Sequence, residues 1–160
     1  NYVENIKRVV KDTDRSRASV ILENTAGQGS EFGYLFEEFG EIYRAIANKK
    51  RVKICLDTAH AFGAGYDWRD IKKCKEAIAL YDKKIGIKNI ACIHFNDSKK
   101  ILGSRVYRHE DIGHGEIGVE GLKNFVFELR KLGGEFIPLI LETPQSYLTY
   151  EEQIKKVKSF

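Results

Sequence analysis

The chain lacks methionine and long apolar runs, and each absence is informative. None of its 160 residues is methionine and it begins at Asn1, so we expect a processed, engineered or fragmentary sequence. The absence of any run of about 18 apolar residues excludes a membrane-spanning helix, and no secretory signal is visible at the N-terminus. We therefore expect no membrane partner and a cytoplasmic location, or a nuclear one in a eukaryote.

Cysteine is also scarce, with an odd set of Cys55, Cys74 and Cys92. The chain contains no C-x-x-C pair, and no thiolate metal site is expected from the sequence. Cys55 and Cys92 lie inside apolar runs, so we expect them to be buried as small hydrophobic residues in a reducing compartment.

The composition is that of a soluble globular protein, with 42% apolar and 31% charged residues. The length suits a single domain over residues 1–160 with a sizeable core. The net charge of +4 permits a polyanionic partner without requiring one.

The apolar pattern predicts a helix followed by four strand–loop–helix units. The expected strands are 18–22, 52–56, 90–93 and 137–141, and the expected helices are 2–11, 31 or 34 to 47, 71–85, 119–132 and 150–157. Glycine-bearing loops, including 58–68 and a long loop over 95–118, connect strands to helices. Such alternation predicts an α/β fold with parallel strands and right-handed crossovers.

Each predicted strand is followed by a possible metal ligand: Glu23, Asp57, His94 and Glu142. The carboxyl ends of parallel strands meet at one edge, so these side chains should converge. Three carboxylates and an imidazole suit Zn²⁺ or Mn²⁺, and they would repel one another without a cation. The alternative is that strands simply turn polar as they leave the core. His60 adds a D-x-x-H pair with Asp57.

The stretch 94–118 combines histidines with basic side chains. It contains His94, His109, His114, Lys99, Lys100, Arg105 and Arg108. Imidazoles bind metals, and Arg and Lys bind phosphates. A solvated surface loop is the alternative interpretation.

Several blocks together carry a family resemblance. They are LENTAGQGS (22–30), CLDTAHAFGAGYD (55–67), HFNDSK (94–99), GSRVYRH (103–109), IGHGEIG (112–118) and LETP (141–144). In this order they resemble the endonuclease IV family of apurinic/apyrimidinic endonucleases. The resemblance implies a (β/α)8 TIM barrel, normally about 250 residues. Four βα units make half of it, so the chain is similar to the C-terminal half, with two open sheet edges.

The resemblance also implies an activity, a cofactor and a substrate. Such enzymes use up to three Zn²⁺ ions, with Mn²⁺ as a second candidate, and cut double-stranded DNA 5′ to an abasic site during base excision repair. Their nucleophile is a metal-activated hydroxide. We expect the complete barrel to be a monomer.

The site residues follow from the matching positions. By resemblance, Glu23 bridges two zincs, Asp57, His94 and Glu142 bind the second, and His60 and His109 bind the third. Glu23 and Glu142 would act in catalysis by orienting the metals and their hydroxide. The expected DNA-binding residues are Lys99, Arg105, Tyr107 and Arg108, and Tyr107, Tyr66 or Trp68 could stack or wedge into DNA, although packing is the better interpretation of Trp68.

Two departures from the family pattern stand out. Tyr107 occupies the position of an aspartate that binds the third zinc, so Asp111 or His114 could substitute, or that metal could be weak or absent. In the family, the first zinc also takes two histidines from the front half of the barrel, and we expect this sequence to lack that half.

Two rival functions stay open at this stage. Metal-dependent sugar isomerases and epimerases use a similar Glu–Asp–His–Glu quartet on the same barrel. A non-catalytic half-barrel that binds DNA through its basic loop is the other rival.

Overall fold

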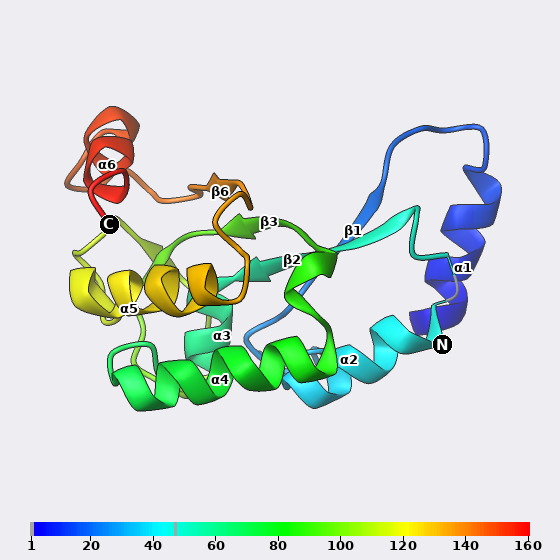
Figure 1. Cartoon of the computed structure of the whole chain (residues 1–160), viewed down its shortest axis with the longest axis horizontal. Coiled ribbons are helices and arrows are strands. Elements are labelled where there is room, and N and C mark those ends of the chain that lie inside the picture. The colour runs from blue at the N-terminus through cyan, green and yellow to red at the C-terminus, as the bar shows by residue number, and fades with distance from the viewer. Residues whose placement is uncertain (1, 47) are drawn as a thin grey trace.

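A computed structural model describes residues 2–46 and 48–160 of the chain. Four parallel strands form one sheet in the order β1-β2-β3-β6 (Figure 1). These are β1 (Val20–Glu23), β2 (Val52–Asp57), β3 (Ile90–His94) and β6 (Leu139–Ile140). The predicted α/β fold with parallel strands is therefore confirmed.

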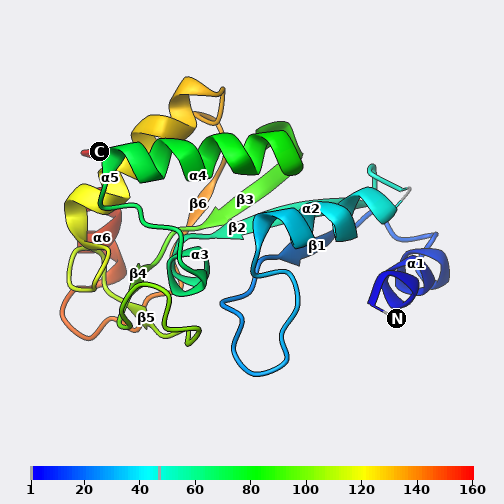
Figure 2. The ribbon, with the colours of Figure 1, turned by 90° about the horizontal axis from the view of Figure 1, so that it is seen from below.

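Helices cover one face of this sheet, and its opposite face is left uncovered (Figures 1 and 2). The covering helices are α2 (Phe36–Ala45), α4 (Ile71–Lys84) and α5 (Gly118–Lys131), while α1 (Tyr2–Asp12) and α6 (Tyr150–Val157) lie at the two ends. Fully buried side chains such as Ile54, Leu56 and Ile93 fill the space beneath the helices. Side chains alternate along a strand, so Cys55 and Asp57 face the uncovered side, as do their pairing partners Cys92 and His94.

Register brings the ends of β2 and β3 level, because Asp57 pairs with His94. The end of β1 is offset from them, since Glu23 pairs with Cys55, two residues before Asp57. The sheet edges at β1 and β6 have no further strand among the described residues. Ile21 and Ile140 are 46% and 43% exposed there, as expected for a barrel sheet seen in part.

The sequence-based prediction was wrong over 58–68, where α3 (Thr58–Ala64) replaces the first part of the expected loop. The Asp57 side chain accepts the His60 N–H at the start of this helix, and Gly65 ends it with φ of 111°. The presence of two glycines in a short segment hid these capping signals.

The long loop expected over 95–118 also contains structure. The strands β4 (Asp97–Ser98) and β5 (His109–Glu110) pair antiparallel within it. Buried Asp97 fixes the rest of the loop by accepting backbone N–H groups from Ser98, Gly113, Gly115, Ile117 and Gly118. The basic segment has backbone bonds of its own, from the Lys99 N–H to the Arg108 carbonyl and from the Arg105 N–H to the Gly63 carbonyl.

Other boundaries differ by smaller amounts. The first strand begins at Val20 instead of residue 18, and the helix after it begins at Phe36 instead of 31 or 34. The predicted last residue of that helix, 47, lies outside the described residues. The fourth strand is only Leu139–Ile140, the two residues that pair with Ile93 and His94 of β3. A short 3-10 helix, η1 (Ile87–Asn89), precedes β3.

No helix in residues 2–46 or 48–160 is long and apolar enough to cross a membrane.

Candidate metal centre

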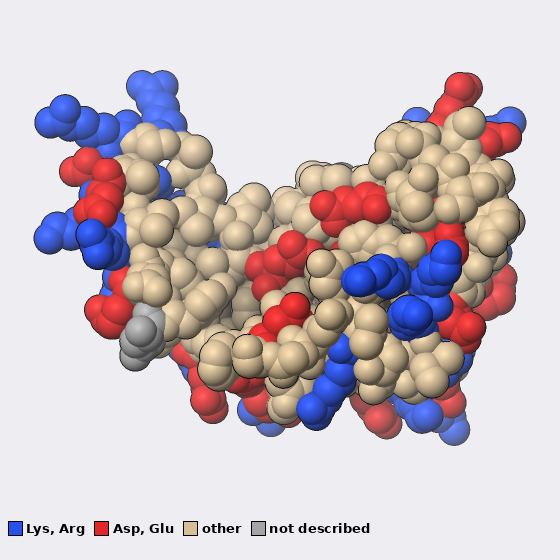
Figure 3. Space-filling view, turned by 180° about the vertical axis from the view of Figure 1, so that it is seen from behind, with Lys and Arg blue, Asp and Glu red and all other residues tan. Residues whose placement is uncertain are grey.

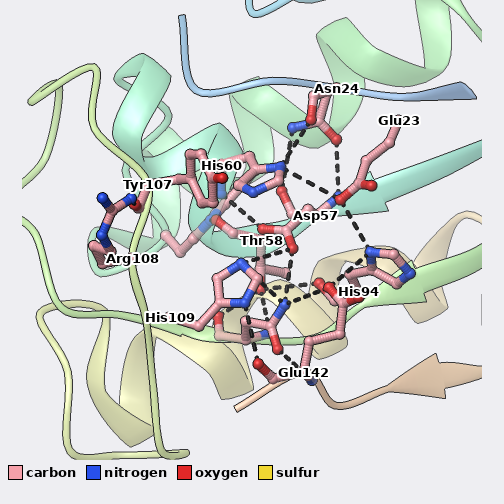
Figure 4. A network of polar contacts seen from close by, with 12 residues as sticks. Glu23, Asn24, Asp57, Thr58, His60, His94, Tyr107, Arg108, His109 and Glu142 are labelled. Atoms are coloured by element: carbon pink, nitrogen blue, oxygen red, sulfur yellow. Dashed lines mark hydrogen bonds and ion pairs between the residues drawn. The ribbon is translucent and has the colours of Figure 1, made fainter. Parts of the chain in front are cut away.

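Four candidate ligands come together at the carboxyl ends of the strands, as Figure 4 shows for the surrounding network. One ligand atom from each of Glu23, Asp57, His94 and Glu142 lies within 4.8 Å of the others. His94 Nδ1 is 2.9 Å from a Glu23 oxygen and 3.0 Å from a Glu142 oxygen. Glu142 lies two residues beyond β6, so its backbone is positioned by contacts outside the sheet. This group is termed the quartet.

A second group shares Asp57 with the quartet. Ligand atoms of Asp57, His60 and His109 also lie within 4.8 Å of one another, and His109 Nε2 is 3.4 Å from an Asp57 oxygen. The Nδ1 atom of His60 contacts the Asn24 carbonyl at 2.9 Å, while its Nε2 is buried without a hydrogen-bond partner in the described part of the chain. A buried, unpartnered ring nitrogen is costly, and a cation would supply its missing partner.

The donor set therefore fits a divalent metal. Carboxylate oxygens and imidazole nitrogens are ligands of hard and borderline cations, and two overlapping groups would allow two ions to share the Asp57 carboxylate. Without a cation, the three carboxylates of the quartet face one another with His94 between them. The chain thus carries residue groups that can hold metal.

Two asparagines, which the sequence analysis missed, hold Asp57 in place. The side-chain oxygen of Asn24 accepts the Asp57 N–H at 2.8 Å, and its amide nitrogen donates to the Asp57 carbonyl at 3.3 Å. The amide of Asn96 donates to the Asp57 carboxylate at 2.8 Å, and its oxygen accepts the Glu142 N–H at 2.8 Å. Asn24 and Asn96 are both fully buried. Asn96 thereby links the ends of β2 and β3 to the segment after β6.

Thr58 completes this network from the start of α3. Its hydroxyl lies 2.7 Å from the Asn96 carbonyl and 2.9 Å from the Asn96 N–H. One signal could have identified Asn96 from the sequence: it stands two residues after His94, which places polar groups on the same side of an extended segment.

The charges of Asp57 and His109 stabilise each other in the metal-free chain. Burial works against the charged carboxylate, but the hydrogen bond from His109 and the nearby His60 outweigh it and lower the pKa of Asp57. Burial likewise disfavours the imidazolium, but the Asp57 carboxylate outweighs it and raises the pKa of His109. Protonation of His109 would therefore compete with a metal ion for this ring.

We expect the stability of the metal-free chain to depend on this pair. The raised pKa of His109 stabilises the fold fully below the ordinary value of 6.5, and the contribution is lost as pH rises through the raised pKa. The lowered pKa of Asp57 contributes above 3.8, and that contribution is lost as pH falls through the lowered pKa. In urea unfolding with a chelator, the contribution of the pair to the free energy of unfolding should be greatest between pH 3.8 and pH 6.5.

The free energy of unfolding of the wild type minus that of His109→Asn measures this contribution. This difference should shrink as the solution becomes more alkaline. His114→Asn, at an exposed histidine, provides the control and should not reproduce this trend. A difference that grows with alkaline pH would contradict the pairing.

The four expected DNA-binding residues border the centre from the loop between β4 and β5. Tyr107 is 39% exposed and its ring meets His60 edge-on, with 5.0 Å between centroids. The Arg108 guanidinium lies over the Tyr107 ring at 5.4 Å. Arg105 lies over the Tyr34 ring at 5.0 Å, and Lys99 is 3.7 Å from Glu110. These contacts leave the cationic groups at the surface.

The surface shows both kinds of charge close together. Acidic side chains lie in the hollowed middle of the face seen in Figure 3, and a group of basic side chains lies to one side of them. This arrangement suits a ligand that combines phosphate groups with an affinity for bound metal.

The structure rejects several of the other residues considered for the site. Tyr66 stacks on Phe36 with 3.7 Å between ring centroids, and its hydroxyl accepts the Phe36 N–H, so it packs and does not wedge. Trp68 is fully buried and donates to the Thr58 carbonyl, as the packing interpretation predicted.

The two proposed substitutes for the missing aspartate are also engaged elsewhere. Both oxygens of buried Asp111 accept backbone N–H groups, from Gln145 on one side and from Tyr147 and Leu148 on the other. His114 is stacked on the Tyr147 ring at 4.7 Å. Neither residue belongs to the Asp57–His60–His109 group, and Tyr107 stays beside it through its ring contact with His60.

The parallel sheet is covered by helices and carries carboxylate and imidazole ligands at the carboxyl ends of its strands, as in TIM-barrel enzymes. The chain belongs to the xylose isomerase-like TIM barrel family, whose model matches residues 1–160. The expected barrel class is thereby confirmed.

Individual relatives narrow this class. The chain is 43% identical over 139 residues to a "Probable endonuclease 4" of Buchnera aphidicola subsp. Acyrthosiphon pisum (strain Tuc7), covering 87% of this chain and 48% of that protein. It is 44% identical over 143 residues to a "Probable endonuclease 4" of Chlorobium phaeobacteroides (strain BS1), covering 89% and 49%. The resemblance to the endonuclease IV family is confirmed by these matches.

A solved structure agrees with these relatives. Endonuclease IV from Thermus thermophilus superposes with a TM-score of 0.75 at 32% identity, over 99% of this chain and 54% of that chain. The chain thus spans about half the length of the relatives that it matches.

Proposed function

We propose that the chain contributes the metal centre of a zinc-dependent endonuclease that cleaves DNA 5′ to abasic sites, and that it corresponds to the C-terminal half of the barrel. The observation that carries the proposal is the pair of ligand groups sharing Asp57 beside a basic loop. The similarity to proteins named endonuclease 4 supports this choice of activity.

Each side chain then has a definite task. Glu23 and Glu142 would hold and orient metal from opposite sides of His94, which contacts both carboxylates. Asp57 would link the two ligand groups, and His60 and His109 would complete the second one. Bound Zn²⁺ would supply an activated hydroxide and neutralise the charge on the attacked phosphate. No side-chain nucleophile is required.

The basic loop would hold the DNA. Lys99, Arg105 and Arg108 would contact backbone phosphates, which position the strand without reading its sequence. The Tyr107 ring contacts Arg108 on one side and His60 on the other and is 39% exposed, so it would be free to stack beside the lesion. The geometry favours this role over metal ligation, because the ring packs edge-on against His60.

Metal content and cleavage of a defined duplex test the proposal together. We would measure zinc per chain by elemental analysis, and cleavage of a duplex carrying one abasic site, on this chain and on a longer protein containing it. The matched duplex without the lesion is the control. We expect bound zinc and chelator-sensitive cutting on the 5′ side, with stronger cutting by the longer protein.

The other outcomes separate the rivals. Turnover of a free sugar with no cleavage would identify an isomerase or epimerase and refute the nuclease. Tight binding of abasic DNA without bound metal or cleavage, by the longer protein as well, would favour a non-catalytic binding module.

A further inference from the structure

A pair of thiols lies on the same face of the sheet as the quartet. Cys55 on β2 is the register partner of Cys92 on β3, two residues before the Asp57–His94 pair. Their sulfur atoms and a ring nitrogen of His94 all lie within 4.8 Å of one another. The expectation of no thiolate metal site was therefore incomplete, because these two cysteines are far apart in the chain and meet only through strand pairing.

The chemistry of this cluster differs from that of the quartet. Two sulfurs and an imidazole favour soft or borderline cations such as Cd²⁺ and Cu⁺, whereas carboxylate oxygens favour harder ones. Around a tetrahedral zinc ion with sulfur ligands at about 2.3 Å, the ligand atoms lie roughly 3.8 Å apart. The three atoms lie within 4.8 Å of one another, so the side chains would have to move by no more than about an ångström to hold an ion of this kind.

We propose that Cys55, Cys92 and His94 form a second, sulfur-rich metal site that captures soft cations in competition with the carboxylate quartet. The competition arises because a neutral imidazole offers one lone pair to a metal, so His94 can serve only one of the two sites at a time. When the soft site is filled, Glu23 and Glu142 lose the ring that lies between them. A soft cation therefore weakens zinc binding by the quartet.

Burial limits access to the thiols, since Cys55 is 1% and Cys92 is 8% exposed. Because side chains alternate along a strand, both lie on the face of the sheet that carries Asp57 and His94. Cys74 is equally buried, on α4 in the helical layer, and it belongs to none of the candidate metal groups of the described residues. It therefore provides a matched control for the other two cysteines.

The test is a Cd²⁺ titration of the full chain kept reduced by a thiol-free reductant. Sulfur-to-cadmium charge transfer in the ultraviolet should appear and saturate at one cadmium per chain. Cys55→Ser and Cys92→Ser should each lose at least half of this absorption, because one of the two thiolates is gone. Cys74→Ser should keep all of it.

Competition is measured on the zinc-loaded chain. Adding Cd²⁺ should lower the zinc that elemental analysis finds after gel filtration, and Cys92→Ser should reduce this loss. Zinc retention that is unaffected by cadmium, despite full charge-transfer absorption, would refute the sharing of His94.

X-ray absorption at the cadmium edge tests the site without any substitution. We expect two sulfur neighbours and at least one nitrogen in the unmodified chain. Only oxygen and nitrogen neighbours, or charge transfer that survives when both Cys55 and Cys92 are replaced in a chain with native circular dichroism, would overturn the proposal. The competition rests on the proposed zinc centre, but the spectroscopy does not require cleavage. Failure of the nuclease and failure of the sulfur site are therefore distinguishable.

Discussion

Replacing Asp57 with asparagine is expected to remove metal from both ligand groups at once. Asp57 is fully buried and is the only residue shared by the quartet and the Asp57–His60–His109 group of the described chain. Loss of an outer-shell partner of a metal typically lowers affinity about 10- to 100-fold, so loss of a shared direct ligand should exceed about 100-fold. Zinc per chain after dialysis and cleavage of an abasic duplex should fall together.

The asparagine variant should still fold. An asparagine oxygen can accept the His60 N–H that the Asp57 carboxylate accepts at 2.7 Å, and asparagine is as good a helix N-cap as aspartate. The amide nitrogen would face the Asn96 amide donor in place of a carboxylate oxygen, which costs about 1–3 kcal/mol of stability. A loss of this size should leave the variant folded, so that a low zinc content would report the missing ligand and not unfolding.

Asp70→Asn is the matched control for this prediction. Asp70 caps α4 by accepting the N–H groups of Lys72 and Lys73, so the same substitution removes the same charge from a helix N-cap. We expect zinc content at the wild-type level and a change in unfolding free energy within about 0.5 kcal/mol. Wild-type zinc in Asp57→Asn, measured beside this control, would exclude Asp57 as a ligand.

The main strands could be predicted because each is a short apolar run followed by a polar residue. Three of them match closely, since β1, β2 and β3 lie beneath helices that demand apolar side chains such as Leu56 and Ile93. The fourth was predicted too long because the apolar run 137–141 extends beyond Leu139 and Ile140, the two residues that pair with β3. Local pattern therefore identifies a strand better than it sets its length.

The candidate ligands could be found from the sequence because chemistry and position coincide in them. Glu23, Asp57 and His94 are each the last residue of a strand, and parallel pairing brings such ends together. Their geometry agrees with the predicted convergence, while their role as ligands stays a proposal. The bonds that hold these ligands could not be predicted in this way. Asn24 and Asn96 bond to residues 33 to 46 positions away, and although the spacing of Asn96 from His94 could mark it as a candidate, no local pattern encodes its partners.

The two cysteines show the same limit from another direction. A search for metal motifs looks for ligands that are close in sequence, and Cys55 and Cys92 are not. Their proximity follows from the register of β2 and β3, including an irregularity between Ile54 and Cys55 that brings the two cysteines opposite each other. A strand that slipped by one residue would turn Cys92 to the other face of the sheet.

Removing the Asn96 side chain should destabilise the chain and weaken its metal binding together. Asn96→Ala leaves the Asp57 carboxylate without one donor and the Glu142 N–H without its acceptor, both of them bonded at 2.8 Å. The Asp57 carboxylate is fully buried, whereas Glu142 is exposed, so the lost bond to Asp57 dominates and the free energy of unfolding should fall by about 1–3 kcal/mol. Zinc affinity should fall about 10- to 100-fold, because the partners that orient two candidate ligands are lost.

Two further variants show whether Asn96 positions the ligands or only supports the fold. Asn124→Ala removes an amide that bonds the carbonyls of Trp68 and Arg69, so it should lower stability and leave zinc affinity unchanged. Asn96→Asp keeps the acceptor for Glu142 but places a carboxylate against Asp57, so the metal-free chain should lose more stability than with alanine.

Saturating zinc should recover part of that loss in Asn96→Asp, because a cation relieves the repulsion between the carboxylates, whereas it cannot restore the missing bonds of Asn96→Ala. Urea unfolding with zinc and with chelator measures this difference. If Asn96→Ala loses stability but binds zinc as tightly as Asn124→Ala, then Asn96 supports the fold alone. The positions of Asp57 and Glu142 would then depend on the backbone of β2, the chain after β6 and the metal itself.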